Sequence, residues 1–270
     1  MTDSKHLLID PIRLSDLLGE ARGRFDVDAL AECESTNTLL LERAERGAPS
    51  GSVLVTDLQT AGRGSRGRSW LASPEASLTF SLLWRFPGGI EGLSGLSLAV
   101  GVAVVQALEA CGASGVQLKW PNDILYGEAK LGGILIELQC DSGSAQAVIG
   151  IGLNLRLPES IGEADGFALQ PAALDCILET LPERHQLFAQ LLIALARVLD
   201  RFSDAGFAAL RAEWQACHAW QDKPVRLLRD GRLEKEGICR GADDDGALLV
   251  HTSAGLERCL SGDLSLRAAR

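Results

Sequence analysis

Residues 59–70 are QTAGRGSRGRSW, a glycine-rich segment between two strand-like runs. Its centre at 62–67 fits G-x-G-x-x-G, the pattern of dinucleotide-binding loops, which open directly onto a helix. Here Pro74 follows and breaks any early helix, so the dinucleotide interpretation is disfavoured. A Walker A phosphate loop is disfavoured further, because position 68 holds arginine where that motif has lysine.

The arginines of this segment favour another interpretation. Arg63, Arg66 and Arg68 lie on a flexible backbone, and guanidinium groups supply forked donors to phosphate oxygens. The glycines allow close approach to a ligand and a change from an open to an ordered loop. Trp70 follows directly, and its indole can stack on a purine. The segment therefore predicts a loop that folds over a polyphosphate, with a solvated basic turn as the alternative.

A second segment, KWPND at 119–123, ends a predicted buried strand. The chain has five lysines and twenty-one arginines, and two of these lysines, Lys119 and Lys130, flank one turn. A compact ammonium group fits between a carboxylate and a phosphate in a narrow pocket, where a guanidinium does not. We expect Lys119 to serve an anionic substrate, and a surface lysine before a proline turn is the alternative.

Small residues interrupt two further strand-like runs. Gly132 and Gly133 lie in the first, and Gly150 and Gly152 lie in the second. Glycine inside a strand indicates close approach of a ligand or of another backbone. Asn154 ends the second run with an amide that can hydrogen-bond an adenine edge as donor and acceptor. A turn-forming asparagine at a strand end is the alternative.

The remaining pattern predicts an α+β fold, because strand-like and helical runs alternate without regular βαβ order. One helix begins at 35–37, where three polar side chains can cap it, and stops at Gly47. We expect strands at 29–33, 52–58, 77–86, 116–120, 130–140 and 147–155, helices at 93–111, 187–202 and 207–218, and an exposed loop at 156–170.

A change of composition near residue 222 predicts two domains after a short lead-in. Residues 1–24 form the lead-in, with one helical turn around Leu14–Leu18, and residues 25–221 form the catalytic domain. In residues 222–270, Asp230-Gly231 between two strand-like runs is a strong hairpin signal. This tail predicts a small β-barrel.

Composition narrows the classes of protein. The net charge of −10 argues against a generic nucleic-acid binder. The seven cysteines are scattered and never form C-x-x-C, and the four histidines are far apart, so we expect reduced cytoplasmic thiols and no metal-binding motif. The N-terminal apolar stretch is too short for a signal peptide, and the longest apolar run, near 191–196, is too short to span a membrane.

Taken together and in order, these segments resemble the biotin–protein ligase family. The matching stretches are STN at 35–37, QTAGRGSRGRSW at 59–70, KWPND at 119–123, KLGGILIE at 130–137, IGIGLN at 149–154 and GDLSLR at 262–267. The resemblance implies a mixed sheet flanked by helices and a C-terminal SH3-like barrel. It also implies biotin and MgATP as substrates, with a biotin carboxyl carrier domain as the partner that receives biotin on one lysine.

The resemblance also assigns roles by position. Lys119 and Arg63 would be catalytic. Biotin would contact Ser35, Thr36, Asn37, Gln59, Arg63, Gly64, Ser65, Lys119 and Gly133. The nucleotide would contact Arg63, Arg66, Arg68, Trp70, Lys119, Asn154 and Arg267.

The sequence departs from the family pattern at two places, and each departure leads to an expectation about function. Many members have arginine where this chain has Ser65, so we expect looser retention of the adenylate unless Arg66 compensates. STN begins at residue 35, which leaves no room for the helix-turn-helix of some members. We therefore expect a monomeric or homodimeric ligase without sequence-specific DNA binding. The alternatives are a lipoate–protein ligase, a vitamin-binding regulator and a generic α+β domain.

Overall fold

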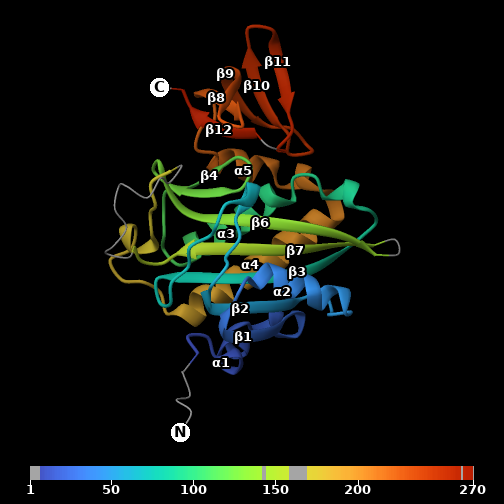
Figure 1. Cartoon of the computed structure of the whole chain (residues 1–270), viewed down its shortest axis with the longest axis vertical. Helices are drawn as coiled ribbons and strands as arrows, with labels where there is room; N and C mark the ends of the chain where they lie inside the picture. Colours follow the sequence, from blue (N-terminus) through green and yellow to red (C-terminus); the bar gives the residue numbers. More distant parts are fainter. Residues whose placement is uncertain (1–6, 142–143, 158–168, 263, 270) are drawn as a thin grey trace.

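A seven-stranded mixed sheet forms the centre of the chain (Figure 1). The computed structural model describes residues 7–141, 144–157, 169–262 and 264–269. The strand order is β1-β2-β3-β7-β6-β5-β4, with β1 and β2 parallel and the other neighbouring pairs antiparallel. The strands are β1 (Asp26–Cys33), β2 (Ser52–Gln59), β3 (Ser77–Pro87), β4 (Val116–Lys119), β5 (Asp123–Tyr126), β6 (Ala129–Asp141) and β7 (Ser144–Asn154). The predicted α+β class with a mixed sheet is confirmed.

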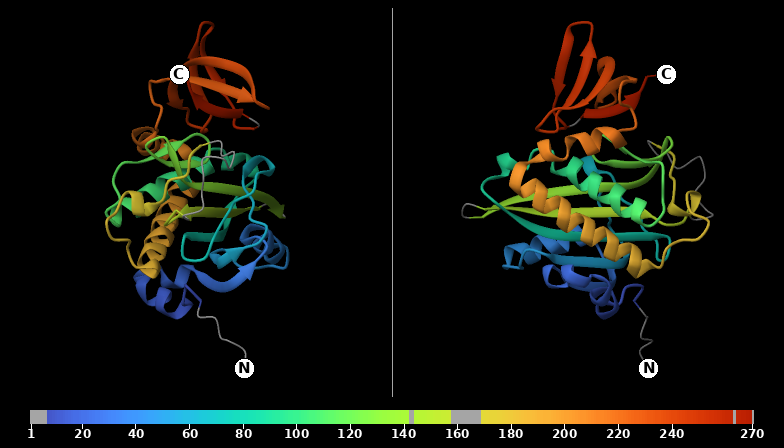
Figure 2. Two further views of the ribbon diagram at one scale, coloured as in Figure 1. Left: turned by 60° about the vertical axis from the view of Figure 1, so that its left-hand side comes forward. Right: turned by 180° about the vertical axis from the view of Figure 1, so that it is seen from behind.

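Helices cover the two faces of this sheet unequally. The long helices α3 (Leu96–Ala110) and α4 (Arg184–Ala205) pack together across one face (Figure 2). Helix α2 (Thr36–Glu45) lies on the other face. Alternation along β3 creates this division, because Phe80 packs against Phe188 of α4, with the two rings tilted by 59°, while the next residue, Ser81, faces α2. The face beneath α2 therefore carries polar side chains over an otherwise apolar sheet.

Several helices and strands differ from the sequence-based prediction. The lead-in contains α1 (Pro11–Leu17) and the 3₁₀ helix η1 (Gly19–Arg24), and its Leu14 and Leu18 are buried in the main core. Strand β5 was not predicted, and β7 begins three residues earlier than expected. The expected helix at 207–218 divides into η5 (Phe207–Ala209) and α5 (Arg211–Cys217). The shorter 3₁₀ helices are η2 (Ser65–Gly67), η3 (Ile90–Leu93) and η4 (Leu174–Cys176).

A separate antiparallel sheet forms the C-terminal end, in the order β11-β10-β9-β8-β12. Its strands are β8 (Pro224–Arg229), β9 (Arg232–Ala242), β10 (Leu248–Thr252), β11 (Gly255–Cys259) and β12 (Leu264–Ala268). Asp230 and Gly231 have φ values of 48° and 77°, as expected for a tight hairpin, and the expected SH3-like architecture is confirmed. This sheet lies beside α5 (Figure 1). The exact domain boundaries stay a prediction, as does most of the loop at 156–170, since residues 158–168 lie outside the described part.

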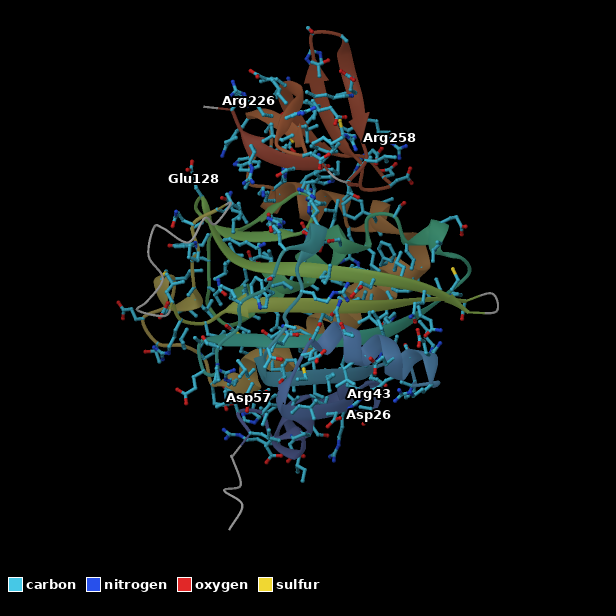
Figure 3. The ribbon with its side chains drawn as sticks, viewed as in Figure 1. Asp26, Arg43, Asp57, Glu128, Arg226 and Arg258 are labelled. Atoms are coloured by element: carbon cyan, nitrogen blue, oxygen red, sulfur yellow. The ribbon has the colours of Figure 1, made fainter. Side chains whose placement is uncertain are left out.

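Charged side chains are spread over the surface at both ends of the molecule (Figure 3). Arg43 pairs with Asp28 at 2.8 Å, and Arg226 pairs with Glu236 at 3.0 Å on the C-terminal sheet. Such exposed pairs contribute at most about 1 kcal/mol each. Among the described helices, none is long and apolar enough to cross a membrane.

Candidate active site

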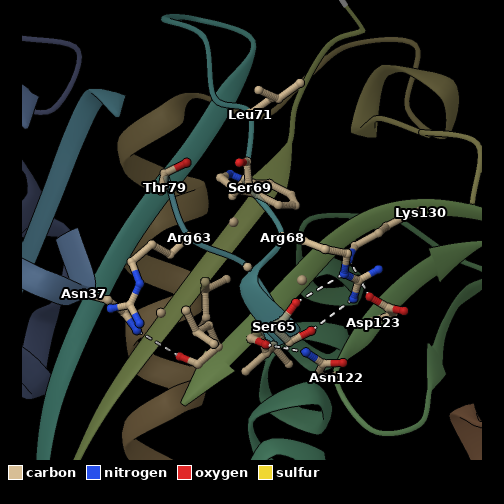
Figure 4. A pocket seen from close by; sticks show the side chains of 18 of the residues that line it. Asn37, Arg63, Ser65, Arg68, Ser69, Leu71, Thr79, Asn122, Asp123 and Lys130 are labelled. Carbon is tan, nitrogen blue, oxygen red and sulfur yellow. Dashed lines mark hydrogen bonds and ion pairs between the residues drawn. The ribbon is translucent and has the colours of Figure 1, made fainter. Parts of the chain in front are cut away.

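A pocket opens on the α2 side of the central sheet, beneath the loop at 62–71 (Figure 4). Its lining includes residues of α2, of the six central strands β2 to β7 and of the C-terminal strand β12. Of the predicted site residues, the pocket brings together Ser35, Thr36, Asn37, Gln59, Arg63, Gly64, Ser65, Arg68, Trp70, Lys119, Gly133, Asn154 and Arg267. Arg66 does not line it.

We call the end of the pocket lined by Thr36 and Gln59 the neutral end, because these two side chains are uncharged and hydrogen-bonded to each other. Gln59 Oε1 accepts from the backbone N–H of Thr36 at 2.8 Å and lies 3.2 Å from the Thr36 hydroxyl. That hydroxyl lies 2.7 Å from the Ser81 hydroxyl. The three side chains are buried, with Ser81 0% exposed. Because Gln59 uses its oxygen on Thr36, its amide nitrogen is the group that remains for a ligand.

Asn37 anchors this end to the neighbouring strand. Its amide donates to the Leu135 carbonyl at 3.3 Å and to the Glu137 carboxylate at 3.0 Å, and its oxygen accepts from Ser81 at 2.6 Å. The amide lies against Gly150, where a β-carbon would overlap it. The close approach predicted at this glycine is therefore made by a side chain of the protein. Asn37 lines the pocket with its amide already engaged, and its predicted contact with biotin stays a prediction.

The other end of the pocket carries a buried charge cluster. Asp123 lies 2.6 Å from Lys119 Nζ and 2.5 Å from Lys130 Nζ. The Lys119 and Asp123 side chains are each 6% exposed, whereas that of Lys130 is 25% exposed. Two ammonium groups around one carboxylate leave one net positive charge, and Lys130 presents it to the pocket.

Burial and charge act together on the titration of this cluster. Burial raises the pKa of the Asp123 carboxyl, but the charges of Lys119 and Lys130 outweigh it and hold the pKa well below its ordinary value. Burial also lowers the pKa of Lys119 despite the attraction of Asp123, and the charge of Arg267 adds to the lowering. Arg267 of β12 thus acts on the charged end from the C-terminal sheet.

The three loop arginines extend to different partners. Arg63 pairs with Glu137 at 2.8 Å, whereas Arg68 turns back to the Ser65 hydroxyl at 3.1 Å (Figure 4). Arg66 has a left-handed φ of 60° and donates to the Leu264 carbonyl of β12. The loop is therefore attached to both the central and the C-terminal sheet, and the role of Arg66 toward nucleotide stays a prediction.

Trp70 and Asn154, the two residues predicted to receive adenine, both line the pocket. The Trp70 indole covers Gly152 so closely that a β-carbon there would overlap the ring, and no described residue accepts from its buried N–H. The Asn154 amide donates to the Lys130 and Ala172 carbonyls at 3.3 and 2.9 Å. Its nitrogen is thus committed to the fold, which leaves its oxygen for a ligand; both nucleotide roles stay predictions.

Sequence reasoning assigned no role to several residues of this pocket. Asp123 and Lys130 lie inside the quoted motifs, so the motifs carried a signal for them. Glu137 is also inside a quoted motif, as the last residue of KLGGILIE, whereas Ser81 carried no signal, because a single polar residue in an apolar strand does not reveal its partner.

Comparisons with known proteins agree with this geometry. Residues 30–154 match the biotin/lipoate A/B protein ligase family, and residues 222–267 match the biotin protein ligase C terminal domain. The bifunctional ligase/repressor BirA of Escherichia coli is 36% identical over 97% of this chain and 81% of that protein. The biotin–[acetyl-CoA-carboxylase] ligase of Mycobacterium tuberculosis is 33% identical over 98% of both.

A solved structure shares the whole architecture. Biotin protein ligase from Aquifex aeolicus, in complex with biotin and ATP, matches with a TM-score of 0.77 at 30% identity. The match covers 90% of this chain and 99% of that one. The chain belongs to the biotin protein ligase family.

Proposed function

We propose that this chain is an ATP-dependent ligase that forms biotinyl-5′-AMP from biotin and ATP and transfers biotin to a lysine of a biotin carboxyl carrier domain. The observation that carries the proposal is the pocket itself, which is neutral and hydrogen-bonded at one end and cationic at the other. Biotin has the same polarity, with a neutral cyclic urea at one end and a carboxylate at the other.

The neutral end suits the urea. Gln59 offers an amide N–H, which fits the urea carbonyl, and Thr36 offers a hydroxyl oxygen beside it. A buried polar site of this kind rejects ligands that leave its groups unpaired. The flat strand surface at Gly133 and the indole of Trp70 line the path from this end toward the lysines.

The cationic end suits the activation of the carboxylate. A biotin carboxylate oxygen attacks the α-phosphorus of ATP, a C–O–P bond forms, and the bond to pyrophosphate breaks. Both reactants are anions, so positive charge must lie between them. Lys119 and Lys130 provide it from the strands and Arg68 provides it from the loop, whereas Arg63 lines the same pocket but is paired with Glu137 near Asn37.

Transfer follows on the same acyl group. The amine nitrogen of the carrier lysine attacks the acyl carbon, an amide C–N bond forms, the C–O bond breaks, and AMP leaves with its electron pair. The amine loses a proton in this step, and no side chain of the described pocket is assigned as its base. A loop closed over the adenylate excludes water until the carrier arrives.

ATP is taken as its Mg²⁺ complex, so the ion enters as part of the substrate. In the described part of the chain, no group of three His, Cys, Asp or Glu side chains is placed to hold a metal. Two carboxylates at the pocket, Asp123 and Glu137, are already paired with lysine and arginine. These residues do not form a metal cage.

Location and DNA binding belong to the same proposal. All seven cysteines are free thiols, which supports a reducing, cytoplasmic location. The absence of sequence-specific DNA binding stays a prediction, and tight, salt-resistant binding to a promoter fragment would contradict it.

The testing experiment measures pyrophosphate release with biotin and ATP, with lipoate as a parallel substrate. A purified biotin carrier domain is then added, and its mass is measured. We expect release with biotin and the mass gain of one biotinyl group on one carrier lysine. Release with lipoate alone would assign the chain to the lipoate ligases, and release with neither acid would contradict a ligase.

A further inference from the structure

At the neutral end of the pocket, the donor and the acceptor of each hydrogen bond can be assigned from the groups that surround them. The assignment begins at Asn37. One side of its amide faces the Leu135 carbonyl and the Glu137 carboxylate, and both of these accept only. That side must therefore be the NH₂ group. The oxygen of Asn37 then faces Ser81 at 2.6 Å and must receive a hydrogen from it.

Ser81 has one hydroxyl hydrogen, and Asn37 takes it. Toward Thr36, at 2.7 Å, Ser81 can therefore only accept. The other neighbour of the Thr36 hydroxyl is the Gln59 oxygen at 3.2 Å, which is fixed as an acceptor because it receives the Thr36 backbone N–H. Both protein neighbours of this hydroxyl are acceptors.

The hydroxyl hydrogen of Thr36 is therefore committed to the protein, whichever neighbour receives it. What Thr36 can present to the pocket is a lone pair, so its ligand partner must be a donor. Beside it, Gln59 presents an N–H and needs an acceptor. An N–H next to a C=O in one ring, as in a cyclic urea, meets both requirements.

We propose that Ser81 and Asn37 are positioning residues that determine specificity at this end of the pocket, by holding the Thr36 hydroxyl as an acceptor for a ring N–H. The inference rests on the proposed function and extends it to two residues that do not need to touch biotin. We call the series of hydrogen bonds from Glu137 through Asn37 and Ser81 to Thr36 the relay. Glu137 begins it, because its carboxylate accepts from the Asn37 NH₂ group and so fixes the orientation of that amide. Ser81 is 0% exposed and Asn37 is 3% exposed, so water does not compete for these bonds.

The test uses biotin and the two cyclic carbamate analogues in which a ring oxygen replaces one urea N–H or the other. In the wild type, one analogue sets an acceptor against the acceptor of Thr36, and we expect its KM to exceed that of biotin roughly 10- to 100-fold. In Ser81→Ala the Thr36 hydroxyl loses its nearer acceptor, at 2.7 Å, and keeps only the Gln59 oxygen at 3.2 Å, so its hydrogen can turn toward the ring oxygen at a lower cost. We expect the KM ratio of that analogue to biotin to fall to within about threefold, with kcat for biotin little changed.

Two further variants keep the result interpretable. Ser81→Cys keeps the shape of serine with a weaker donor, so an intermediate ratio is expected, and this variant serves if Ser81→Ala does not fold. Ser77→Ala removes a hydroxyl from the same strand and the same face, outside the relay, and should retain the wild-type ratio. A purely structural role for Ser81 would raise the KM of biotin and of both analogues equally.

The outcomes separate the inference from the proposed function. Turnover of biotin by the wild type, with the same analogue ratio in folded Ser81→Ala, would overturn the inference and leave the ligase assignment standing. Absence of biotin-dependent pyrophosphate release in the wild type would overturn the ligase assignment and the inference together. A collapsed ratio in Ser81→Ala with an unchanged ratio in Ser77→Ala supports the relay.

Discussion

The two ends of the pocket recognise their ligand groups by different physical means. At the neutral end, Thr36, Gln59 and Ser81 are buried and bonded to one another, so the direction of each bond is set before any ligand arrives. At the charged end, Lys130 is partly exposed and the arginines lie on an outer loop. Pre-set neutral groups discriminate between ligands, whereas charges on adaptable segments can follow the charge as it moves during the reaction.

At the charged end, the lysine ammonium groups are already paired with a carboxylate of the protein. Lys119 and Lys130 share Asp123, so an arriving phosphate must compete with this carboxylate, and part of the attraction is spent in separating the pairs. At the neutral end the groups that face the ligand, Thr36 and Gln59, are uncharged, and the Arg63–Glu137 pair contacts Asn37. Perturbing each end should therefore change different kinetic constants.

The largest expected effect is at the two lysines. Lys119→Ala and Lys130→Ala should each lower the rate of pyrophosphate release by about 10²–10³, because each removes charge between two anions. Each substitution leaves Asp123 with one lysine partner, but the Lys119 side chain is 6% exposed and that of Lys130 is 25% exposed, so Lys119→Ala should lower the melting temperature more than Lys130→Ala. Rates and thermal melts are measured together.

A matched control for these variants is Lys235→Ala, which removes a lysine paired with Glu257 on the C-terminal sheet. Its adenylation rate should equal that of the wild type. A folded, fully active Lys119→Ala would remove Lys119 from the mechanism and leave Lys130 as the principal cation.

The next effect is on stability and concerns the support of the charged end. His218 stacks on Trp214 and lies beside the strand that carries Lys119, since the Ala219 N–H donates to the Leu118 carbonyl at 2.9 Å. Burial lowers the pKa of His218 to about 4 from an ordinary value of 6.5, and Lys223 adds to the shift. Below pH 6.5 the unfolded chain gains this proton while the folded chain does not, so stability falls as the pH drops from 6.5 to 4.

The loss attributable to His218 should approach roughly 3 kcal/mol at pH 4 and then level off. Denaturant unfolding at several pH values measures it. His218→Phe keeps the stacking on Trp214 without a titrating group and should flatten this slope, while His251→Phe on β10 is the control for removing a histidine. A slope in His218→Phe equal to that of the wild type would assign the acid sensitivity to other groups.

At the neutral end, a smaller and purely kinetic effect is expected. Gln59→Leu removes the donor for the urea carbonyl and should raise the KM of biotin about 10- to 100-fold, while kcat at saturating biotin changes little. The contrast with the lysine variants, which should lower kcat itself, is the test of the division between the two ends. A fall in kcat equal to that of Lys130→Ala would show that the ends do not act separately.

Local pattern predicted most elements of the fold but only part of the site. Alternation and glycine placement predicted the long strands, and the apolar spacing from Leu187 to Phe202 predicted α4. Strand β5 was missed because its four residues, DILY, are too short for a periodic signal.

The quoted motifs located Thr36, Gln59 and Lys119, but the partners of these residues lie far away in sequence. Ser81 and Glu137 are 44 and 100 positions from Asn37, and only the strand register brings them together. Asp123 is the intermediate case, since KWPND contains it while only the β4–β5 hairpin turns it toward Lys119.

The smallest expected effect lies on the loop, at Ser65. Arg66 donates to β12 and does not line the pocket, so we predict that it does not compensate for the absence of an arginine at position 65. Ser65→Arg adds a partly exposed charge near the adenylate, and such pairs contribute up to about 1 kcal/mol, so release of the adenylate should slow about two- to fivefold. The measurement is the fraction of labelled biotinyl-AMP that passes a filter retaining the protein. The control, Ser69→Arg, adds the same charge elsewhere on the loop. Slower release in Ser65→Arg alone would assign retention of the adenylate to position 65. Equal leakage from the wild type and Ser65→Arg would show that loop charge does not limit retention at the charged end.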